Sequence, residues 1–498
     1  MNVNPITRLD YPDPDVIRVE DTYYMVSTTM HFMPGCEILQ SFDLVHWEHV
    51  TYVYETLDHT DAQQLKSGQN IYGQGMWAAS LRYHEGRFYI CFVANDTRKT
   101  YLYTSEKIDG PWKKQLIEGF YHDGSLLFDE DGRNYIVYGN DEIWITELNE
   151  DLTAPKKDGL HRLLVSDHKN PELGYEGSHI QKINGYYYIF LIHSLRDRWM
   201  RTEACFYSDS LEGEFTGGDV LCDDRGYCGQ GVAQGGIVDT PDGKWYAMLF
   251  QDSGAVGRLP ILLPVTWKDH FPVFGQNGHV PEEIEVHSTR PGYIYQPLVG
   301  SDDFCNGLLP RWQFNHDPDP QYYHLDALQG TYTITTREVC TELTQAVNTL
   351  TQRMSYPSCA AEVTVDASAL KEGDVAGLCA FQGCYAAVGI TKHHGKYEVL
   401  MLDKKEDGIL DMTEGTVVES HQMDFRLEAD FCNMKDEARC YYRVNKGDWL
   451  PIGTVHKLYF KLDHFTGCRF GLFCYAAEET GGSACFRDFK YYDVDEIS

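Results

Sequence analysis

A hairpin motif that recurs five times is the feature that most limits how this chain can fold. Each copy has a turn residue, two or three aromatic residues and an apolar strand, and the copies end at Tyr24, Tyr89, Tyr135, Tyr188 and Tyr246. Four copies carry Glu-Gly, Asp-Gly or Asn-Gly at the turn. Asn-Gly and Asp-Gly favour tight hairpins because both residues tolerate positive φ. The pattern therefore predicts five β-hairpins.

The spacing of the hairpins indicates how they are arranged. The five tyrosines lie 65, 46, 53 and 58 residues apart, which is close to the length of a four-stranded sheet with its loops. Five such units predict a five-bladed β-propeller. An array of sandwiches or barrels is the alternative, but its strands would not restart the same hairpin five times.

Counting backward from the tyrosines predicts a functional site. Twelve residues before the last four tyrosines, and eleven before the first, the chain carries one polar or aromatic residue per repeat, namely Asp13, Trp77, Asp123, Glu176 and Gln234. Equivalent positions in repeated blades lie around one axis, so these residues should form a ring at the channel mouth. Each carboxylate alone is also typical of a turn or a strand end. Three carboxylates at equivalent positions of the repeats favour a functional site, because a cluster of like charges lowers the stability of the fold.

The hairpin repeat ends near Gln276-Asn-Gly278, and a different strand pattern follows. Alternating segments such as Cys359–Val365, Tyr397–Leu402 and Phe470–Tyr475 are typical of a β-sandwich. We therefore predict an all-β protein with a five-bladed β-propeller at residues 1–298 and a jelly-roll, concanavalin-like β-sandwich at residues 299–498.

Charge and cysteine content narrow the partners and the compartment. The formal net charge is −33, which disfavours nucleic acid and anionic membrane surfaces and favours a small neutral ligand. The 15 cysteines contain no CxxC pair, as expected of reduced thiols. The first residues lack signal-peptide features and no apolar run reaches membrane-spanning length. We expect a cytoplasmic protein. The sequence is compatible with a homo-oligomer.

Motifs in a fixed order show that the chain resembles glycoside hydrolase family 43, in its β-xylosidase and α-L-arabinofuranosidase branch. The resemblance covers nearly the whole chain, including the start of that branch's concanavalin-like sandwich. The motifs are Tyr11-Pro-Asp-Pro-Asp15, Met33-Pro-Gly35, Ser41-Phe-Asp-Leu-Val-His-Trp47, Met76-Trp-Ala-Ala-Ser-Leu-Arg-Tyr83, His122-Asp-Gly-Ser-Leu126, Tyr175-Glu-Gly-Ser-His179, Gly257-Arg-Leu-Pro260 and Asp302-Asp-Phe304.

The resemblance implies a role for each carboxylate. Asp13 would be the general base, Glu176 the general acid, and Asp123 the group that raises the pKa of the acid and orients it. Inverting hydrolysis independently requires an acid and a base about 6.5–9.5 Å apart, and a neighbouring carboxylate keeps an acid protonated. Spacing alone does not assign the roles.

The resemblance also implies residues that contact substrate. Arg258 matches a substrate-binding arginine, and Trp77 would face the terminal sugar. The alternative for Arg258 is a structural salt bridge, and the alternative for Trp77 is a place in the core of a blade. His179, three residues after Glu176, either reaches the rim of the predicted pocket or is an ordinary polar residue of a strand. Where xylosidase relatives carry an aromatic cluster, this chain has Met30-His-Phe32-Met33, so we expect Met30 and Phe32 to reshape the terminal subsite.

The fifth blade departs from the family pattern. Gln234 stands where family members commonly carry a histidine that helps to hold an axial metal ion. A neutral amide is a poor ligand for a soft metal and a modest one for calcium. We therefore disfavour an axial calcium ion and expect neither a required cofactor nor metal-ligating residues. Gln234 is instead predicted to contact the substrate.

These residues and the resemblance together favour an inverting exo-glycosidase. It would release terminal xylosyl and α-L-arabinofuranosyl residues from xylo- or arabinoxylo-oligosaccharides. One alternative is a xylan-debranching α-L-arabinofuranosidase without xylosidase activity. Another is a non-catalytic carbohydrate-binding propeller. We expect the sandwich to narrow the site as a lid through Gly481–Phe486, with an independent carbohydrate-binding module as the alternative.

Overall fold

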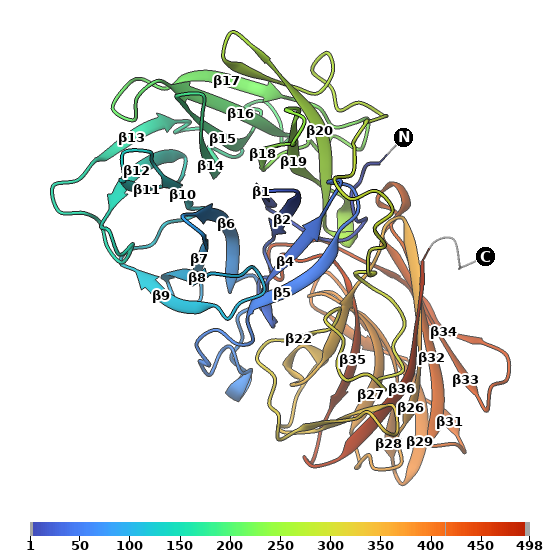
Figure 1. Cartoon of the computed structure of the whole chain (residues 1–498). Coiled ribbons are helices and arrows are strands. Elements are labelled where there is room, and N and C mark those ends of the chain that lie inside the picture. The colour runs from blue at the N-terminus through green and yellow to red at the C-terminus, as the bar shows by residue number, and fades with distance from the viewer. Residues whose placement is uncertain (1–2, 414, 494–498) are drawn as a thin grey trace.

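The computed structural model describes residues 3–413 and 415–493. Five four-stranded antiparallel sheets surround one axis and form the propeller (Figure 1). Their strands are β1 (Asp15–Val19), β2 (Thr22–Val26), β4 (Gly35–Ser41) and β5 (Glu48–Tyr54) in blade I; β6 (Met76–His84), β7 (Arg87–Ala94), β8 (Lys99–Ser105) and β9 (Lys113–Ile117) in blade II; β10 (Ser125–Phe128), β11 (Asn134–Asn140), β12 (Glu142–Leu148) and β13 (His161–Ser166) in blade III; β14 (Glu176–Ile183), β15 (Tyr186–Ser194), β16 (Arg201–Ser208) and β17 (Thr216–Leu221) in blade IV; and β18 (Gly236–Asp239), β19 (Trp245–Asp252), β20 (Arg258–Lys268) and β21 (Phe271–Phe274) in blade V.

The recurring hairpin joins the first two strands of every blade. In blades II and IV the two-residue turns Glu85-Gly86 and Asn184-Gly185 have positive φ at both residues, as expected of the primed turn. In blades III and V the Asp-Gly pair lies inside a longer loop, and only its glycine, Gly132 or Gly243, has positive φ. The hairpins are confirmed, although the Asp-Gly turns are longer than the dipeptide predicts.

The aromatic residues of the motif explain how the blades pack. Tyr135 lies in an apolar cluster between blades III and IV, Tyr188 between IV and V, and Tyr246 between V and I. Because each ring fills the space between two neighbouring sheets, the same residue type is useful in every repeat. The N-terminal segment closes the circle, since Ile6 N donates to Pro260 O of β20 at 2.8 Å.

The second half of the chain is a β-sandwich. One sheet contains β22 (Gln313–Asn315), β25 (Leu350–Arg353), β35 (Arg469–Tyr475), β27 (Val375–Phe381), β28 (Ala386–His393), β29 (Lys396–Lys404), β30 (Leu410–Met412) and β31 (Thr416–Val418). The other contains β23 (Tyr323–Asp326), β24 (Thr331–Thr335), β36 (Ser483–Asp493), β26 (Ser358–Asp366), β32 (Gln422–Asp430), β33 (Glu437–Val444) and β34 (Leu450–Lys457). Short 3₁₀ turns lie at η1 (Lys66–Gly68), η2 (Gly254–Val256), η3 (Leu343–Gln345) and η4 (Cys432–Met434).

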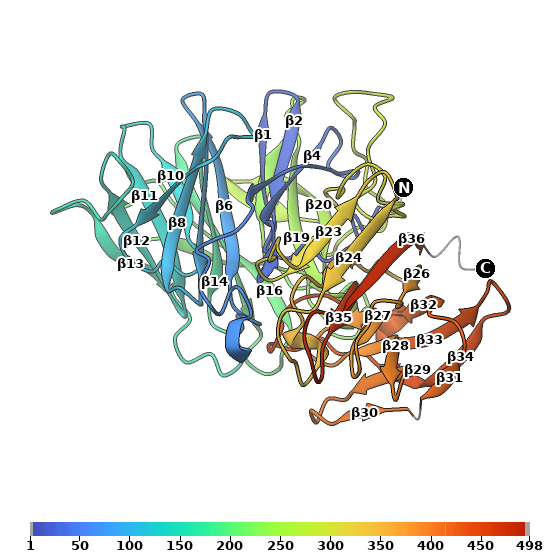
Figure 2. The same ribbon diagram turned by 90° about the horizontal axis from the view of Figure 1, so that it is seen from below.

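The propeller and the sandwich are joined by backbone and side-chain contacts. A short strand of the propeller, β3 (Phe32–Met33), pairs with β22 and so extends a sandwich sheet. Arg353 of β25 forms an ion pair with Glu37 of β4 at 2.8 Å, and both side chains are buried. Figure 2 shows the sandwich against one end of the propeller. The exact boundary between residues 298 and 299 stays a prediction.

The structure also shows the state of the cysteines and the lengths of the helices. All 15 cysteines are free, and ten of them are buried. Among the residues that the structure describes, no helix is long and apolar enough to cross a membrane.

Candidate active site

The five counted residues lie together at the start of the inner strands. Asp13, Asp123 and Gln234 each stand two residues before an inner strand, Glu176 begins β14, and Trp77 is the second residue of β6. β6 and β14 each contain a register shift just after these residues, and such bulges redirect side chains near active sites. The structure therefore brings the residues to one end of the propeller channel.

Asp13 is held by two neighbouring side chains. Thr28 Oγ1 donates to Asp13 Oδ2 at 2.6 Å. Arg258 Nη1 lies 3.2 Å from Asp13 Oδ1 and 3.4 Å from Oδ2, and both side chains are buried. The backbone of Asp13 has a φ of 52°, a left-handed conformation that aspartate tolerates better than most residues. Arg258 thus orients this carboxylate directly: the structural salt bridge predicted as the alternative role of Arg258 is present, and its partner is Asp13.

Glu176 and Asp123 form a second cluster with His122 and Asn140. Asn140 Nδ2 donates to Glu176 Oε2 at 2.8 Å, and Gly177 N donates to Asp123 Oδ2 at 3.0 Å. His122 Nε2 lies 3.5 Å from both Asp123 Oδ2 and Glu176 Oε2. The two contacts to Glu176, from Asn140 and His122, both use Oε2, so Oε1 is the oxygen left to face a substrate.

The electrostatics of this cluster keep a proton near the carboxylates. Burial raises the pKa of Asp123 to about 6, and the charges of Glu176 and Asp13 add to the rise while His122 opposes it. The negative charge of Asp123, with lesser help from Glu176, raises the pKa of His122 to about 9. His122 is therefore a cation at neutral pH, and it balances part of the negative charge.

This arrangement has the parts that glycoside hydrolysis needs. Asp13 and Glu176 come from blades I and IV, which are not neighbours, and they have different partners. A carboxylate held by an arginine and a hydroxyl group can accept a proton from water, and a carboxyl group beside another carboxylate can donate one. The geometry is thus compatible with a base and an acid on opposite sides of a sugar.

A wall of alternating aromatic rings and guanidinium groups borders the carboxylates. Arg258 lies 4.3 Å from the ring centroid of Phe465 and 5.5 Å from that of Phe250. Trp77 stands beside Phe465, with ring centroids 5.6 Å apart, and beside His122, at 5.9 Å. Aromatic faces of this kind suit the apolar faces of sugars. Trp77 is thus where the sequence predicts it.

Phe465 comes from the sandwich, and its loop is tied to the propeller. Asp10 accepts hydrogen bonds from Gly467 N of this loop at 2.7 Å and from Arg258 N at 2.8 Å. The predicted lid segment Gly481–Phe486 lies elsewhere, because its second half begins β36 and pairs with β24. That placement was wrong. The sandwich does reach the site, but through the residue 459–467 loop.

Two other predicted contacts are not at the site. The ring of Phe32 is 0 % exposed and packs among sandwich residues, with the guanidinium of Arg469 3.5 Å from its centroid. The prediction for Phe32 was wrong because β3 turns its ring into the interface. Met30 is also buried, and its backbone bridges Met76 beside Trp77. Met30 therefore packs behind Trp77, on the side of the aromatic wall away from the carboxylates.

The residues at the channel axis do not fit an axial metal ion. The carboxamide of Gln234 is packed so closely on Gly177 that a Cβ there would lie 2.1 Å from Gln234 Cδ. His179 is buried, and its Nδ1 lies 3.0 Å from Asp15 Oδ1. Calcium takes six to eight oxygen ligands, whereas Gln234 offers one amide oxygen and His179 is paired with Asp15. His179 and Gln234 therefore line the axis beneath the carboxylates.

One group of described residues has metal-ligand spacing. The ligand atoms of His122, Asp123 and Glu176 lie within 4.8 Å of one another. An ion there would occupy the oxygen atoms that hold and orient the candidate acid. We therefore assign the cluster to proton chemistry.

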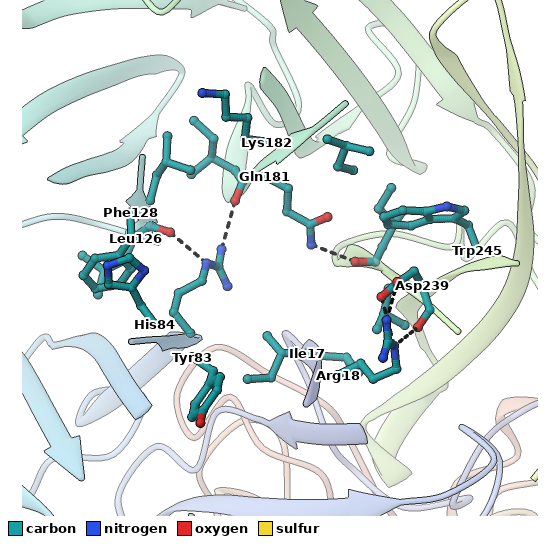
Figure 3. Close-up of a pocket in the computed structure, with 17 residues that line it drawn as sticks. Ile17, Arg18, Tyr83, His84, Leu126, Phe128, Gln181, Lys182, Asp239 and Trp245 are labelled. Carbon is teal, nitrogen blue, oxygen red and sulfur yellow. Dashed lines mark hydrogen bonds and ion pairs between the residues drawn. The ribbon is translucent and has the colours of Figure 1, made fainter. Parts of the chain in front are cut away.

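A separate cavity of about 410 Å³ opens at the other mouth of the channel (Figure 3). It is lined by the far ends of the five inner strands, including Tyr83, Gln181 and Asp239, and by Trp245 at the start of β19. Its cations are paired, as in Arg18 with Asp239 at 2.5 Å. The candidate carboxylates are at the opposite ends of the inner strands, so this cavity is not the candidate active site.

Comparisons with known proteins agree with this geometry. The model of glycosyl hydrolases family 43 matches residues 3–272, and the model of the beta xylosidase C-terminal concanavalin A-like domain matches residues 301–492. A Beta-xylosidase of Formosa agariphila is 27 % identical over 99 % of this chain and 89 % of its own length.

Two solved structures are similar over nearly the whole chain. A protein of Bacteroides eggerthii described as a bifunctional GH43-CE is 42 % identical, with a TM-score of 0.92, over 99 % of this chain and 64 % of its own. The present chain thus spans about two thirds of that protein. A GH43 glycoside hydrolase engineered to display endo-xylanase and exo-arabinofuranosidase activity is 27 % identical, with a TM-score of 0.85, over 99 % of both chains.

Proposed function

Because the chain belongs to glycosyl hydrolase family 43, we propose that it is an inverting exo-glycosidase acting on xylo- and arabinoxylo-oligosaccharides. It releases terminal xylosyl and α-L-arabinofuranosyl residues. The observation that carries the proposal is the placement of Asp13 and Glu176 on non-adjacent blades with separate partners. Water activated by Asp13 attacks the anomeric carbon while Glu176 protonates the leaving oxygen.

Asp123 and the wall complete the proposed site. Asp123 lies in the same cluster as Glu176, because His122 Nε2 is 3.5 Å from an oxygen of each carboxyl group. Trp77 and Phe465 enclose the terminal sugar, and the contribution of the sandwich to that wall favours an exo mode of attack. The substrate is small and neutral, in keeping with the net charge of −33. No cofactor takes part in these steps.

The dual sugar preference is supported by relatives rather than by a sugar-specific contact. One similar protein is named a Beta-xylosidase, and another displays exo-arabinofuranosidase activity. An α-L-arabinofuranosidase without xylosidase activity is the second candidate, because Met30 and Phe32 lie in the core and leave Trp77 and Phe465 as the aromatic wall.

The test is proton NMR of the first anomer formed from xylobiose and from an arabinoxylo-oligosaccharide. Inverted products from both substrates are expected. A retained anomer would contradict the mechanism, release of arabinose alone would favour the second candidate, and binding without products would indicate a carbohydrate-binding propeller.

We also propose a cytoplasmic location, supported by the 15 free cysteines and testable by cell fractionation.

A further inference from the structure

The leaving group of this reaction needs its own binding surface, and blade IV offers one. Glu176 begins β14, the chain runs down β14 and returns along β15, and the β15–β16 turn therefore lies at the same end as Glu176. Asn140 at the end of β11 confirms this geometry in blade III, because it contacts Glu176. Trp199 lies in the β15–β16 turn and is 45 % exposed.

Trp199 is connected to the site by fixed contacts. The guanidinium of Arg201 lies 5.3 Å from the ring centroid of Trp199 and 5.3 Å from that of Phe250. Phe250 in turn contacts Arg258 at 5.5 Å, so Trp199 continues the aromatic and guanidinium wall beyond the carboxylates. Arg201 Nε donates to Asp252 Oδ2 at 2.7 Å, which holds the guanidinium in place.

Arg201 is a cation on the same side of the propeller as the reacting groups. Burial lowers the pKa of Arg201, but the charge of Asp252, with added contributions from Glu176 and Asp13, raises it overall. The neighbouring cations of the turn are paired with carboxylates, Arg196 with Asp167 and Arg198 with Asp197. The surface around Trp199 therefore suits a neutral ligand better than an acidic one.

The chemistry of the reaction specifies what would lie there. The general acid protonates the glycosidic oxygen, so the leaving sugar must lie on the side of the acid, away from the water that Asp13 activates. Xylopyranose has no hydroxymethyl group, and its flat C–H faces match an exposed indole ring. Whether xylose or arabinofuranose is released, the sugar on the leaving side is a xylosyl unit.

We propose that Trp199, supported by Arg201, forms the subsite that binds the leaving xylosyl unit. The subsite rests on the proposed function and determines which leaving groups the enzyme accepts. It contributes to the cleavage of oligosaccharides and has no part to play when the leaving group is a single atom.

The experiment compares xylotriose with β-xylosyl fluoride, and an arabinoxylo-oligosaccharide with α-L-arabinofuranosyl fluoride. For Trp199→Ala, the ratio of kcat/KM for oligosaccharide to that for fluoride should fall about tenfold, the scale of one aromatic stacking contact. Trp199→Phe should recover part of the ratio. Tyr83→Ala is the matched control, because Tyr83 is 44 % exposed at the opposite mouth, and it should leave the ratio unchanged.

The outcomes separate this inference from the proposed function. An unchanged ratio in Trp199→Ala, with an active wild type, overturns the subsite and leaves the glycosidase intact. An equal loss on both substrate types also overturns it, because it indicates a general structural defect. A wild type that hydrolyses none of the four substrates overturns both proposals.

Discussion

The guanidinium of Arg258 lies between the two domains, 4.3 Å from the ring centroid of Phe465 in the sandwich and 3.2 Å from Asp13 Oδ1 in the propeller. Arg258 Nη2 also donates to Phe465 O at 3.4 Å. The residue that orients the candidate base is therefore itself positioned by the second domain. The sandwich is part of the active site.

Removal of the Phe465 ring should weaken catalysis without unfolding the protein. We expect Phe465→Ala to lower kcat/KM on aryl xylosides about tenfold, because Arg258 loses a cation–π contact and the sugar loses a wall. Steady-state kinetics measure the loss of catalysis, and a melting curve shows whether the variant stays folded. Leu462→Ala is the control, because this side chain of the same loop is 75 % exposed. Equal effects of the two substitutions would argue against a specific role for Phe465.

The roles of acid and base can be separated by the leaving group. Glu176→Gln should lose most activity on xylobiose but keep much of it on a 2,4-dinitrophenyl glycoside, because a good leaving group needs little protonation. Asp13→Asn should lose about 10²- to 10⁴-fold on both, because water still needs a base. Reversal of the two patterns would exchange the assignments.

His122 should influence the pH dependence of the enzyme. His122→Asn removes a positive charge 3.5 Å from Glu176 Oε2, so it should shift the alkaline limb of kcat/KM to higher pH. An unshifted limb would show that the charge of His122 does not reach the acid.

His122 also links stability to pH. Its pKa of about 9 in the folded protein lies above the ordinary value of 6.5. Its stabilising contribution is therefore full below pH 6.5 and disappears as the pH rises through 9. Wild-type stability in urea should fall more over this interval than that of His122→Asn. A parallel fall of both proteins would contradict the shift.

Chelation should leave the activity unchanged. The axial side chains Gln234 and His179 lie against Gly177 and Asp15, so we propose that no step depends on an axial ion. We expect dialysis against EDTA, and later addition of calcium, to have no effect on kcat or on the melting temperature. A loss that calcium restores would show that an ion is required and would contradict this assignment.

The Arg353–Glu37 ion pair should make the junction of the domains sensitive to acid. Burial would raise the pKa of Glu37, but Arg353 and His49 lower it to about 2 from an ordinary 4.5. The resulting stability is present above pH 4.5 and is lost as the pH falls toward 2. Arg353→Met removes the arginine partner of the buried Glu37 carboxylate and leaves His49 Nδ1, 3.0 Å from Glu37 Oε1, as its remaining basic neighbour. The substitution should cost about 3–5 kcal/mol at pH 7.

Chemical denaturation of Arg353→Met and of a matched variant checks this cost. Arg439→Met removes an exposed partner of Glu437 and should change the free energy of unfolding by less than about 0.5 kcal/mol. A double variant, Arg353→Met with Glu37→Met, should recover most of the loss, because no buried charge is left unpaired. Similar losses in the two single variants would refute the ion pair as the source.

Much of the site could be predicted from the sequence because it repeats with the blades. Asp13, Asp123 and Glu176 occupy one position in a recurring unit, and a repeat places equivalent residues around an axis without any knowledge of the contacts between them. His122 and Asn140 carry no such signal. His122 is visible only as the neighbour of Asp123, and Asn140 becomes a partner of Glu176 because two strand ends from different blades meet.

The order of hairpins along the chain was enough to determine the all-β propeller, its five blades and the ring of carboxylates, since local turns and strand patterns act within each repeat. Only the tertiary structure decided which side chains complete the site. Phe32 looked like a pocket residue and is buried because β3 joins the sandwich, whereas Phe465, more than 200 positions further along the chain than Arg258, reaches the active site. Contacts between distant segments depend on how the two domains dock, and no short-range pattern records that docking.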